Sequence, residues 1–513
     1  MRKIFFLTIF FLIFINIFAI YDQSWLDIND FHIMVTNFGV IGMDVFSGSV
    51  AGAYWPAGFP NETYFWGSGI WFGALVDSLT DSNNLITDTL VSFGYDPSHS
   101  LTEFIPGVVG ISEDPSVRVY LSTSDNDGYG WPIKDRYNRD SILSDQDSYC
   151  WYSDKDPNHQ EFSPFKSIGI EVFQYSYAWT ADSLKDIVIF KFEIVNLRDD
   201  RKKIRNCYFS ISADPDIAND SETSTNELLG FIDTMTVRNN RTGISELVRM
   251  NTVYQFQLDS EIGWHSNPGI PSLVLISTPK AESDIDLYGD GGLIINKYEE
   301  IGLTSFTPLK SYYDPNSTTA QYLVMSGHNF KTFDPTNPDL SYESFPKWGK
   351  GVVGYPGKTE RPEEEGDKRF VISTGPFDLD YNEKAVFAVA YVINPTPDDI
   401  LKNTLKLFKL FKNSDYSSID EKKRVLMEKN KFSFYLTKDV FGNEIDLYLT
   451  NSDMNNVDID ILDIQGKKVL QVYKGIVFKD KNIKVKHNLS SGVYFVRCIY
   501  GDKNIVKKIK ILK

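Results

Sequence analysis

Apolar and polar residues alternate along much of this chain, with the period of two that is typical of half-buried β-strands. Residues 187–197 show the pattern clearly: Phe190 and Phe192 fall on one face of the expected strand, and Lys191 and Glu193 on the other. Because tight turns rich in Gly, Asn and Asp separate such stretches, we predict sheets rather than helical bundles.

Three long stretches of this kind follow one another and predict an antiparallel meander with one wet face. They cover residues 168–179, 187–197 and 207–213, and further strands are predicted at 272–277, 321–325 and 386–394. The chain contains 28 Tyr, 36 Phe and 9 Trp, and aromatic residues favour sheet over helix. We therefore predict a mainly β protein whose residues 21–395 form a large antiparallel β-rich body; the sequence leaves open whether this body has two subdomains.

One segment departs from the β pattern. Thr396-Pro397-Asp398-Asp399 has the features of a helix start, with a capping residue, a Pro in the first turn and acids near the positive end of the helix dipole. Apolar residues then recur at helical spacing, at Ile400, Leu401, Leu405, Leu407, Phe408 and Phe411. With a second helix expected at 418–429, residues 396–431 are predicted to form a helical spacer.

The final stretch, residues 432–513, predicts a separate small β-sandwich of immunoglobulin-like type. Val457 to Ile461 alternates apolar and acidic residues, Gln465-Gly466 marks a turn, and residues 493–497 and 505–513 predict the last strands. Short strands with turn residues at regular spacing are typical of small antiparallel sandwiches.

The motifs of this stretch and their order resemble the type A C-terminal sorting domain of the type IX secretion system, which exports proteins across the outer membrane of Bacteroidota-like bacteria. The resemblance rests on Asp463–Val469, on Leu489–Val496 and on a Lys-rich last strand, and its motif residues are Asp463, Gly466, Gly492, Tyr494, Lys507 and Lys508. It implies a partner in the outer-membrane type IX machinery and a location outside the cell or on its surface. Such domains often open with an Asn-Pro strand, which this sequence lacks near Phe432, so a generic terminal domain without a sorting role remains the alternative.

The N-terminus has the pattern of a secretory signal peptide. Met1-Arg2-Lys3 is followed by a nearly continuous apolar run from Ile4 to Ile20, with Ala19 before a plausible cleavage point. We assign residues 1–20 to this signal, which implies the general secretion machinery of the inner membrane as a second partner. An uncleaved anchor is the alternative; no later stretch is apolar enough to predict a span in the mature chain.

Charge is unevenly distributed and limits the classes of partner. Residues 431–513 carry 15 Lys and Arg against 9 Asp and Glu, a net charge of +6. Because the whole chain has a net charge of −17, the first 430 residues carry −17 − 6 = −23. Because phosphate recognition needs clustered Lys and Arg, we predict no nucleic-acid partner. Cys150, Cys207 and Cys498 form no metal-binding pattern, and the sequence does not decide whether any two form a disulfide.

The sequence contains no complete phosphate-binding, dinucleotide-binding, zinc-protease or hydrolase motif, so we nominate no catalytic and no cofactor-binding residue. The best candidates for chemistry are acidic loops. Asp214, Asp216 and Asp220 could supply oxygen ligands to a structural calcium ion, and similar loops stand at 125–128 and 284–291. The alternative is ordinary turn chemistry, since Asp favours turns.

Two hypotheses for function follow. The preferred one is a secreted or surface-displayed protein with a structural, adhesive or binding role and without catalysis. The alternative is a secreted hydrolase acting on carbohydrate, because two suitably placed carboxylates suffice and one sequence cannot reveal them. Seven of the nine Trp lie in the first 180 residues, where they could stack on surface glycans or pack in the core. The body also resembles exported proteins without an assigned activity, on residues 41–76, 214–217 and 369–377.

Overall fold

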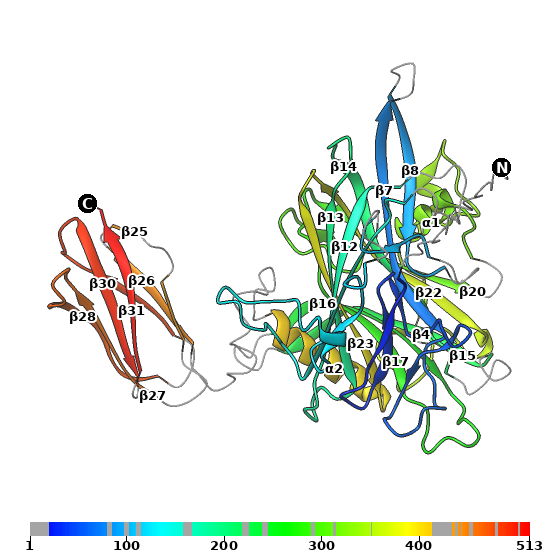
Figure 1. The fold of residues 1–513 in the computed structure, drawn as a ribbon, viewed down its shortest axis with the longest axis horizontal. Coiled ribbons are helices and arrows are strands. Elements are labelled where there is room, and N and C mark those ends of the chain that lie inside the picture. The colour runs from blue at the N-terminus through cyan, green and yellow to red at the C-terminus, as the bar shows by residue number, and fades with distance from the viewer. Residues whose placement is uncertain are drawn as a thin grey trace, which may run out of the picture. The chain divides into compact units, whose positions relative to one another are not determined.

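The computed structural model of the chain contains two compact units, residues 1–418 and 419–513, which are described separately (Figure 1). The predicted signal peptide lies almost wholly outside the described residues. Residues described are 20–79, 85–96, 102–108, 114–156, 167–217, 225–238, 245–288, 293–310, 314–349, 351–412, 433–436, 440–442, 444–450, 455–477, 481–500 and 503–512.

The first unit, here called the body, is built on two large sheets. The nine-stranded sheet has the order β1-β2-β3-β7-β14-β22-β20, with β6 paired to β2 and β8 to β7. Its strands are β1 (Gln23–Leu26), β2 (His32–Thr36), β3 (Val40–Ile41), β6 (Ala53–Tyr54), β7 (Gly67–Leu79), β8 (Leu85–Phe93), β14 (Ile204–Asp214), β20 (Ser305–Lys310) and β22 (Lys368–Leu379).

The second large sheet has ten strands in the order β10-β11-β12-β13-β23-β17-β16-β15-β21, with β9 paired to β11. They are β9 (Ile105–Pro106), β10 (Tyr120–Leu121), β11 (Gln146–Ser153), β12 (Ile170–Ala178), β13 (Ile187–Asn196), β15 (Glu227–Arg238), β16 (Ser245–Gln257), β17 (Ile270–Ser277), β21 (Lys358–Thr359) and β23 (Lys384–Asn394). Short pairs add β4 (Met43–Asp44) with β5 (Val50–Ala51) and β18 (Ile285–Asp286) with β19 (Ile294–Ile295), and 3-10 turns stand at Asn126–Gly128, Pro338–Ser341 and Pro362–Glu364.

The two sheets pack face to face around one hydrophobic core. Alternate residues of β14, such as Phe209 and Ile211, are fully buried there, as are Phe387 and Val389 of β23. The rings of Phe209 and Phe387 stack with their centroids 4.2 Å apart. The alternation seen in the sequence therefore becomes the inner face of a sandwich, and the prediction of a mainly β, largely antiparallel fold is confirmed.

The predicted meander is wrong at its third strand. β12 pairs with β13 as expected, but the next neighbour of β13 is β23, and β14 lies in the other sheet between β7 and β22. The apolar faces of β13 and β14 meet across the core instead, where the ring centroids of Phe192 and Phe209 are 5.4 Å apart. Packing β13 against β14 across the core buries the apolar faces of both strands at once. Had the two strands paired side by side in one sheet, other elements would have been needed to cover those faces.

Two helices cover the outer faces of the sandwich (Figure 1). The short helix α1 (Thr318–Met325) packs Val324 and Met325 against Trp71 of the nine-stranded sheet. Its residues 321–325 were predicted as a strand, which is wrong: Ser317 accepts a hydrogen bond from the Ala320 amide and caps a helix start.

Helix α2 (Pro397–Lys412) packs on β17, β23 and β16 of the ten-stranded sheet. Ile400, Leu407 and Phe408 are buried, as their helical spacing predicts. The second helix expected at 418–429 lies outside the described residues. Among those described, no helix is long and apolar enough to cross a membrane.

The C-terminal unit packs a three-stranded and a five-stranded sheet around a small core of its own. The three strands are β24 (Ser433–Leu436), β26 (Glu444–Thr450) and β29 (Lys481–Lys486), and the five are β25 (Val440–Phe441), β31 (Lys503–Ile511), β30 (Gly492–Tyr500), β27 (Asn455–Leu462) and β28 (Lys468–Val477). Ile459 and Ile461 of β27 and Leu447 of β26 are fully buried. The pairing is antiparallel except between β25 and β31, and the immunoglobulin-like topology stays a prediction.

Candidate functional site

The acidic residues singled out in the sequence lie at the end of β14, on the outer face of the nine-stranded sheet. Asp214 is the last residue of β14 and Asp216 follows it, whereas Asp220 lies outside the described residues. The structure adds Asp367, which directly precedes β22. The three carboxylates of Asp214, Asp216 and Asp367, here called the aspartate cluster, have oxygens within 4.8 Å of one another.

Strand pairing explains why residues so distant in sequence meet. β14 and β22 are antiparallel and Ala213 pairs with Phe370, so the end of β14 lies beside the start of β22. On the other side of β14, Asp214 pairs with Gly67 of β7. A Cβ atom on residue 67 would lie only 2.7 Å from a ring carbon of Tyr95. Glycine at this position therefore leaves room for Tyr95, whose hydroxyl donates to Oδ2 of Asp214 at 3.0 Å.

One guanidinium group stands among the carboxylates. Nε of Arg369 forms an ion pair with Oδ2 of Asp214 at 3.0 Å, and its Nη1 donates to Oδ2 of Asp314 at 2.8 Å. Oδ2 of Asp214 is therefore held by Tyr95 and Arg369, while its Oδ1 is buried without a hydrogen-bond partner. Oδ1 of Asp367 is likewise buried and unpartnered.

Glu227, at the start of β15, holds the two acidic segments together. Its carboxylate accepts hydrogen bonds from the amide of Ile217 at 2.9 Å and from the amide of Lys368 at 3.3 Å. These amides belong to the residues directly after Asp216 and Asp367. Glu227 is fully buried, so it acts as a fixed clamp that positions both carboxylates.

The environment of the cluster disfavours negative charge. Burial raises the pKa of Asp214 and Asp216, and neighbouring carboxylates raise it further, although Arg369 opposes the shift. Burial, followed by the charge of Asp216, also raises the pKa of Glu227. For Arg369, burial disfavours the charged form, but the carboxylates of Asp214 and Asp314 outweigh it and raise its pKa. The cluster thus brings together more carboxyl groups than its one neighbouring guanidinium can neutralise as carboxylates.

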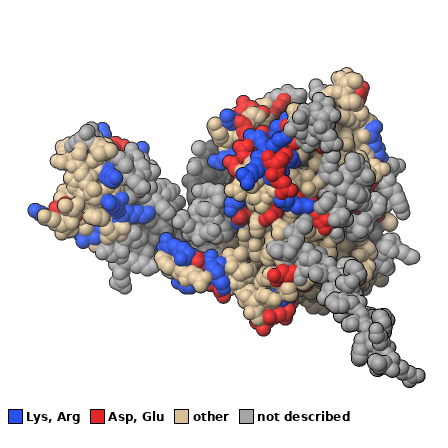
Figure 2. Space-filling view, turned by 45° about the horizontal axis from the view of Figure 1, so that its top comes forward, with Lys and Arg blue, Asp and Glu red and all other residues tan. Residues whose placement is uncertain are grey.

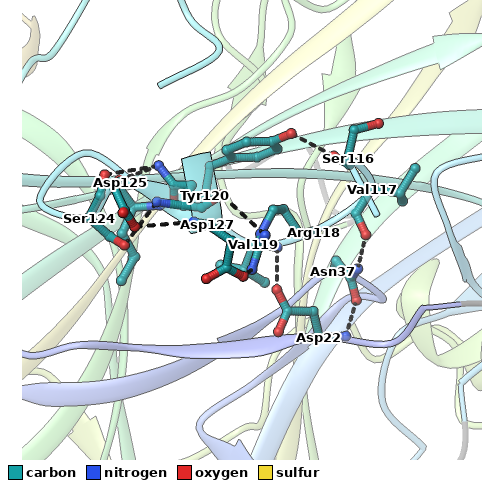
Figure 3. Close-up of polar contacts among 12 residues, drawn as sticks. Asp22, Asn37, Ser116, Val117, Arg118, Val119, Tyr120, Ser124, Asp125 and Asp127 are labelled. Atoms are coloured by element: carbon teal, nitrogen blue, oxygen red, sulfur yellow. Dashed lines mark hydrogen bonds and ion pairs between the residues drawn. The ribbon is translucent and has the colours of Figure 1, made fainter. Parts of the chain in front are cut away.

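The loop at 125–128, also predicted as a possible calcium loop, is organised differently (Figure 3). Asp125 accepts a hydrogen bond from the Asp127 amide, and Asp127 forms an ion pair with Arg118 at 2.6 Å. The side-chain NH2 group of Asn126 donates to the backbone carbonyls of Leu121, Ser124 and Gly130. Its side-chain oxygen accepts a hydrogen bond from the Leu121 amide. The polar groups of this loop are thus satisfied by the turn itself.

In the third predicted loop, Asp284 and Asp286 also accept backbone hydrogen bonds, from the amides of Lys297 and Tyr288. Asp290, the other acid of that loop, lies outside the described residues. Sequence reasoning missed Asp367, Glu227, Tyr95 and Asp314. The only signal for Asp367 is an acid directly before a strand, which is too common to single it out.

A second feature of the body is a cavity of about 400 Å³ beside the edge strand β20, here called the β20 pocket. Its apolar wall includes Phe306, Phe330 and Trp348, and its polar lining is His328, Asn329, Lys331, Glu343, Glu360 and Glu364. Aromatic faces combined with a few convergent polar groups are typical of small-molecule sites.

The residues of the sorting motif occupy turns and strands of the C-terminal unit. Oδ1 of Asp463 accepts hydrogen bonds from the amides of Gln465 and Lys467, both at 2.9 Å. Gly466, in the same turn, has a φ of 80°, a conformation that favours glycine. These contacts explain why an Asp and a Gly stand three residues apart in this hairpin.

The other motif residues lie on the paired strands β30 and β31. Gly492 starts β30, and Tyr494 packs against the core of the unit while its hydroxyl donates to the Ser490 carbonyl at 3.1 Å. Lys507 and Lys508 lie opposite Val496 and Phe495 on β31. In Figure 2, Lys and Arg are prominent on the C-terminal unit, whereas acidic and basic side chains intermingle on the visible face of the body.

Comparison with known proteins identifies the C-terminal unit. Residues 442–512 match the secretion system C-terminal sorting domain, while no curated protein matches the chain. Among solved structures, a polysaccharide lyase shares 8% identity over 86% of this chain and 46% of its own, with a TM-score of 0.19. Dimeric latent PorU from Porphyromonas gingivalis shares 9% identity over 90% and 42%, with a TM-score of 0.15.

The chain spans less than half of either structure, and both superpositions are too poor to support an argument about fold or activity. The sorting-domain match covers the motif residues Asp463 to Lys508 and confirms the resemblance seen in the sequence. A domain of this kind implies interaction with the type IX secretion machinery. The chain therefore carries a type IX C-terminal sorting domain at residues 442–512, which indicates export and secretion or attachment to the outer cell surface.

Proposed function

We propose that the body is a binding module without catalysis, carried outside the cell by the sorting domain, and that its β20 pocket binds a neutral saccharide. The observation that carries this proposal is the lining of the pocket. Phe330 and Trp348 are partly buried and offer apolar ring faces, with the fully buried Phe306 packed against Trp348. Exposed polar groups such as Lys331 and Glu343 stand beside them. Sugars combine apolar C–H faces with hydroxyl groups, so they suit such a surface.

The carboxylates of the pocket favour binding over hydrolysis. Glu360 accepts from the Lys368 ammonium at 3.1 Å and from the Leu229 amide at 2.9 Å. Glu364 accepts from the Arg361 amide at 2.8 Å. Two of the three carboxylates are thus engaged by the protein, whereas glycoside hydrolysis needs a free pair, about 5 to 10 Å apart.

The charge of the body favours a neutral ligand over an anionic one. The first 430 residues carry a net charge of −23, and the pocket itself contains three carboxylates. Both features repel polyanions at moderate ionic strength.

A secreted carbohydrate hydrolase remains the second candidate, because one observation favours it. Burial raises the pKa of Glu360, whereas hydrogen bonds from Arg361, opposed by slight burial, lower that of Glu364. Carboxyl groups with pKa values moved apart are typical of an acid and a base in one site. The two candidates predict different outcomes with the same ligand.

The test is calorimetric titration of the full chain with neutral oligosaccharides, namely gluco-, xylo- and manno-oligosaccharides, and with an anionic uronate oligomer as a comparison. We expect binding of a neutral oligosaccharide and no release of reducing ends on prolonged incubation. Loss of the aromatic contact in Trp348→Ala should weaken binding about tenfold. Because Trp348 also contacts Phe231 and Phe306, exposed Glu343→Gln serves as a variant that leaves the core intact.

The control is Lys347→Ala, an exposed neighbour that does not line the pocket. It should bind as the wild type does. Absence of binding to every neutral oligosaccharide would refute the proposal, and release of reducing ends would establish the hydrolase instead.

A further inference from the structure

We propose that Asp214, Asp216 and Asp367 bind a calcium ion on the outer face of the nine-stranded sheet, joining the end of β14 to the start of β22. The inference is independent of the β20 pocket, since the two sites share no residue. It also differs from the site expected from sequence, because Asp367 directly precedes β22 and lies more than a hundred residues from Asp214 along the chain.

Proximity of three acids alone is weak evidence, and the state of Asp214 supplies a second observation. This residue is only 2% exposed. Its Oδ2 accepts a hydrogen bond from Tyr95 and forms an ion pair with Arg369, whereas its Oδ1 is buried without any hydrogen-bond partner. A buried carboxylate oxygen without a partner costs free energy, and a bound cation would satisfy it.

The charges around the cluster lead to the same conclusion. Arg369 is shared between Asp214 and Asp314, and the ammonium group of neighbouring Lys368 binds Glu360 and a backbone carbonyl instead. Glu227 from β15 adds a further buried carboxyl group. The described groups that face the cluster therefore provide one guanidinium for several carboxylates, and a divalent cation would correct this imbalance.

The ligand set indicates the class of metal. The three side chains offer carboxylate oxygens only, which hard cations prefer. Asp216 and Asp367 are half-buried, so water could complete the coordination from the open side. Calcium accepts such irregular sets of carboxylates and water, whereas magnesium demands near-octahedral geometry.

Glu227 fixes the positions of the two acidic segments relative to each other. By binding the amides of Ile217 and Lys368, it fixes the residues directly after two of the three ligands. The backbone of Asp214 is fixed in turn by the β-ladder to Gly67 and by the amide of Trp66, which donates to the Asp214 carbonyl at 3.0 Å. All three ligands are thus held by backbone contacts that need no metal.

The test uses the full chain freed of metal with EDTA and then titrated with CaCl2 alone. The midpoint temperature of thermal unfolding should rise with calcium concentration, because an ion that binds only the folded state stabilises it by mass action. Terbium(III) luminescence gives a second measurement that does not depend on stability. Tyr95 touches Asp214 and should sensitise a terbium ion in the site, and CaCl2 should displace that ion.

Asp216→Asn and Asp367→Asn keep the shape of the side chain and remove its charge, and each should abolish most of the thermal shift and weaken terbium binding at least about tenfold. The matched control is Asp125→Asn, whose remaining oxygen can still accept from the Asp127 amide. It should retain the calcium response of the wild type.

The proposal fails if the wild-type chain shows neither a calcium-dependent shift nor terbium luminescence that calcium displaces. It also fails if both asparagine variants respond to calcium as the wild type does, because the ion would then bind elsewhere. A response to MgCl2 in the absence of any response to CaCl2 would overturn the assignment to calcium.

Discussion

A buried aspartate stands at the centre of a charged group in each unit, and the two groups are balanced differently. In the C-terminal unit, Asp460 of β27 is 3% exposed and forms ion pairs with Lys468 at 2.5 Å and Arg497 at 2.8 Å. In the body, Asp214 is 2% exposed but shares a single Arg369 with other carboxylates.

The pKa shifts of the two aspartates are opposite for this reason. Burial raises the pKa of both groups, but at Asp460 the bonds to Lys468 and Arg497 outweigh burial and lower it below its usual value. At Asp214 one guanidinium does not compensate for burial and the neighbouring carboxylates, so the pKa is raised. A similarly small solvent exposure thus accompanies a paired aspartate in one unit and an aspartate with too little counter-charge in the other, although Asp214 also lies much deeper in the protein than Asp460.

Removing the cation from the body should have the largest effect. Arg369→Met leaves Asp214 and Asp314 without their counter-charge, and breaking a buried pair in this way typically costs about 3 to 5 kcal/mol. All nine Trp lie in the body, between residues 25 and 348, so Trp fluorescence during urea unfolding in EDTA measures the stability of this unit alone. Calcium should recover part of the loss.

The matched control for Arg369 is Arg205→Met, because Arg205 pairs with Asp77 at the surface, at 2.6 Å. Surface pairs contribute little, so its unfolding curve should overlay that of the wild type. Equal unfolding curves for Arg369→Met and the wild type would show that Arg369 does not balance the cluster.

The clamp residue should give the next largest effect. Glu227→Gln has one oxygen for two backbone amides, so either the Ile217 or the Lys368 amide would face an NH2 group. A buried donor without an acceptor costs about 1 to 3 kcal/mol. Urea unfolding checks the loss, and faster hydrogen exchange at residues 217 and 368 would locate it; exposed Glu383→Gln is the control and should change neither.

Acid should act on the C-terminal unit through Asp460. Its folded-state pKa lies below the model-peptide value of 3.8, so the unfolded chain binds protons first as the pH falls. The stabilisation by its ion pairs is therefore complete above about pH 4 and is lost as the pH falls through the folded-state pKa. Hydrogen exchange of β27 and β30 should accelerate over this range.

Asp460→Asn isolates this contribution. The variant cannot ionise, so at neutral pH it should be less stable by about 1 kcal/mol, given that Lys468 and Arg497 are partly exposed. The hydrogen-exchange rates of the variant and of the wild type should become equal as the pH falls, because Asp460 of the wild type then loses its charge as well. Rates that remain separated at the lowest pH would mean that Asp460 is not the titrating group.

The same two regions show what sequence could and could not predict. The sorting motif is local: Asp463 and Gly466 form one turn through contacts within five residues, so the sequence pattern carries the geometry. In the body, the spacing of Asp214 and Asp216 is local too and was recognised. Asp367 joins them only because β14 pairs with β22, and no local pattern specifies that pairing.

The predicted sheet membership of β14 is wrong for a related reason. Alternation identified β13 and β14 as strands, but an apolar face can be buried by a partner across the core as well as by the elements that cover a single sheet. The aromatic contact between Phe192 and Phe209 settles the choice only once the rest of the chain is in place. Periodicity thus identifies the strands without specifying which sheet each one joins.

The smallest effect is expected in the 125–128 loop, where the charge is already balanced. The Asp127 side chain is 78% exposed and pairs with Arg118 at the surface, so Asp127→Ala should cost less than about 1 kcal/mol. Arg118 keeps its bond to the Asn126 carbonyl, and the Asn126 side chain still holds the turn. Urea unfolding followed by Trp fluorescence measures this loss.

The same variant also tests the contrast between the two acidic loops. Because the 125–128 loop satisfies its own polar groups, Asp127→Ala should show the full calcium-dependent shift of the wild-type chain. If the shift disappeared in Asp127→Ala and persisted in Asp367→Asn, calcium would bind the loop whose groups are already paired. Unpartnered buried oxygens would then be a poor guide to cation sites in this fold.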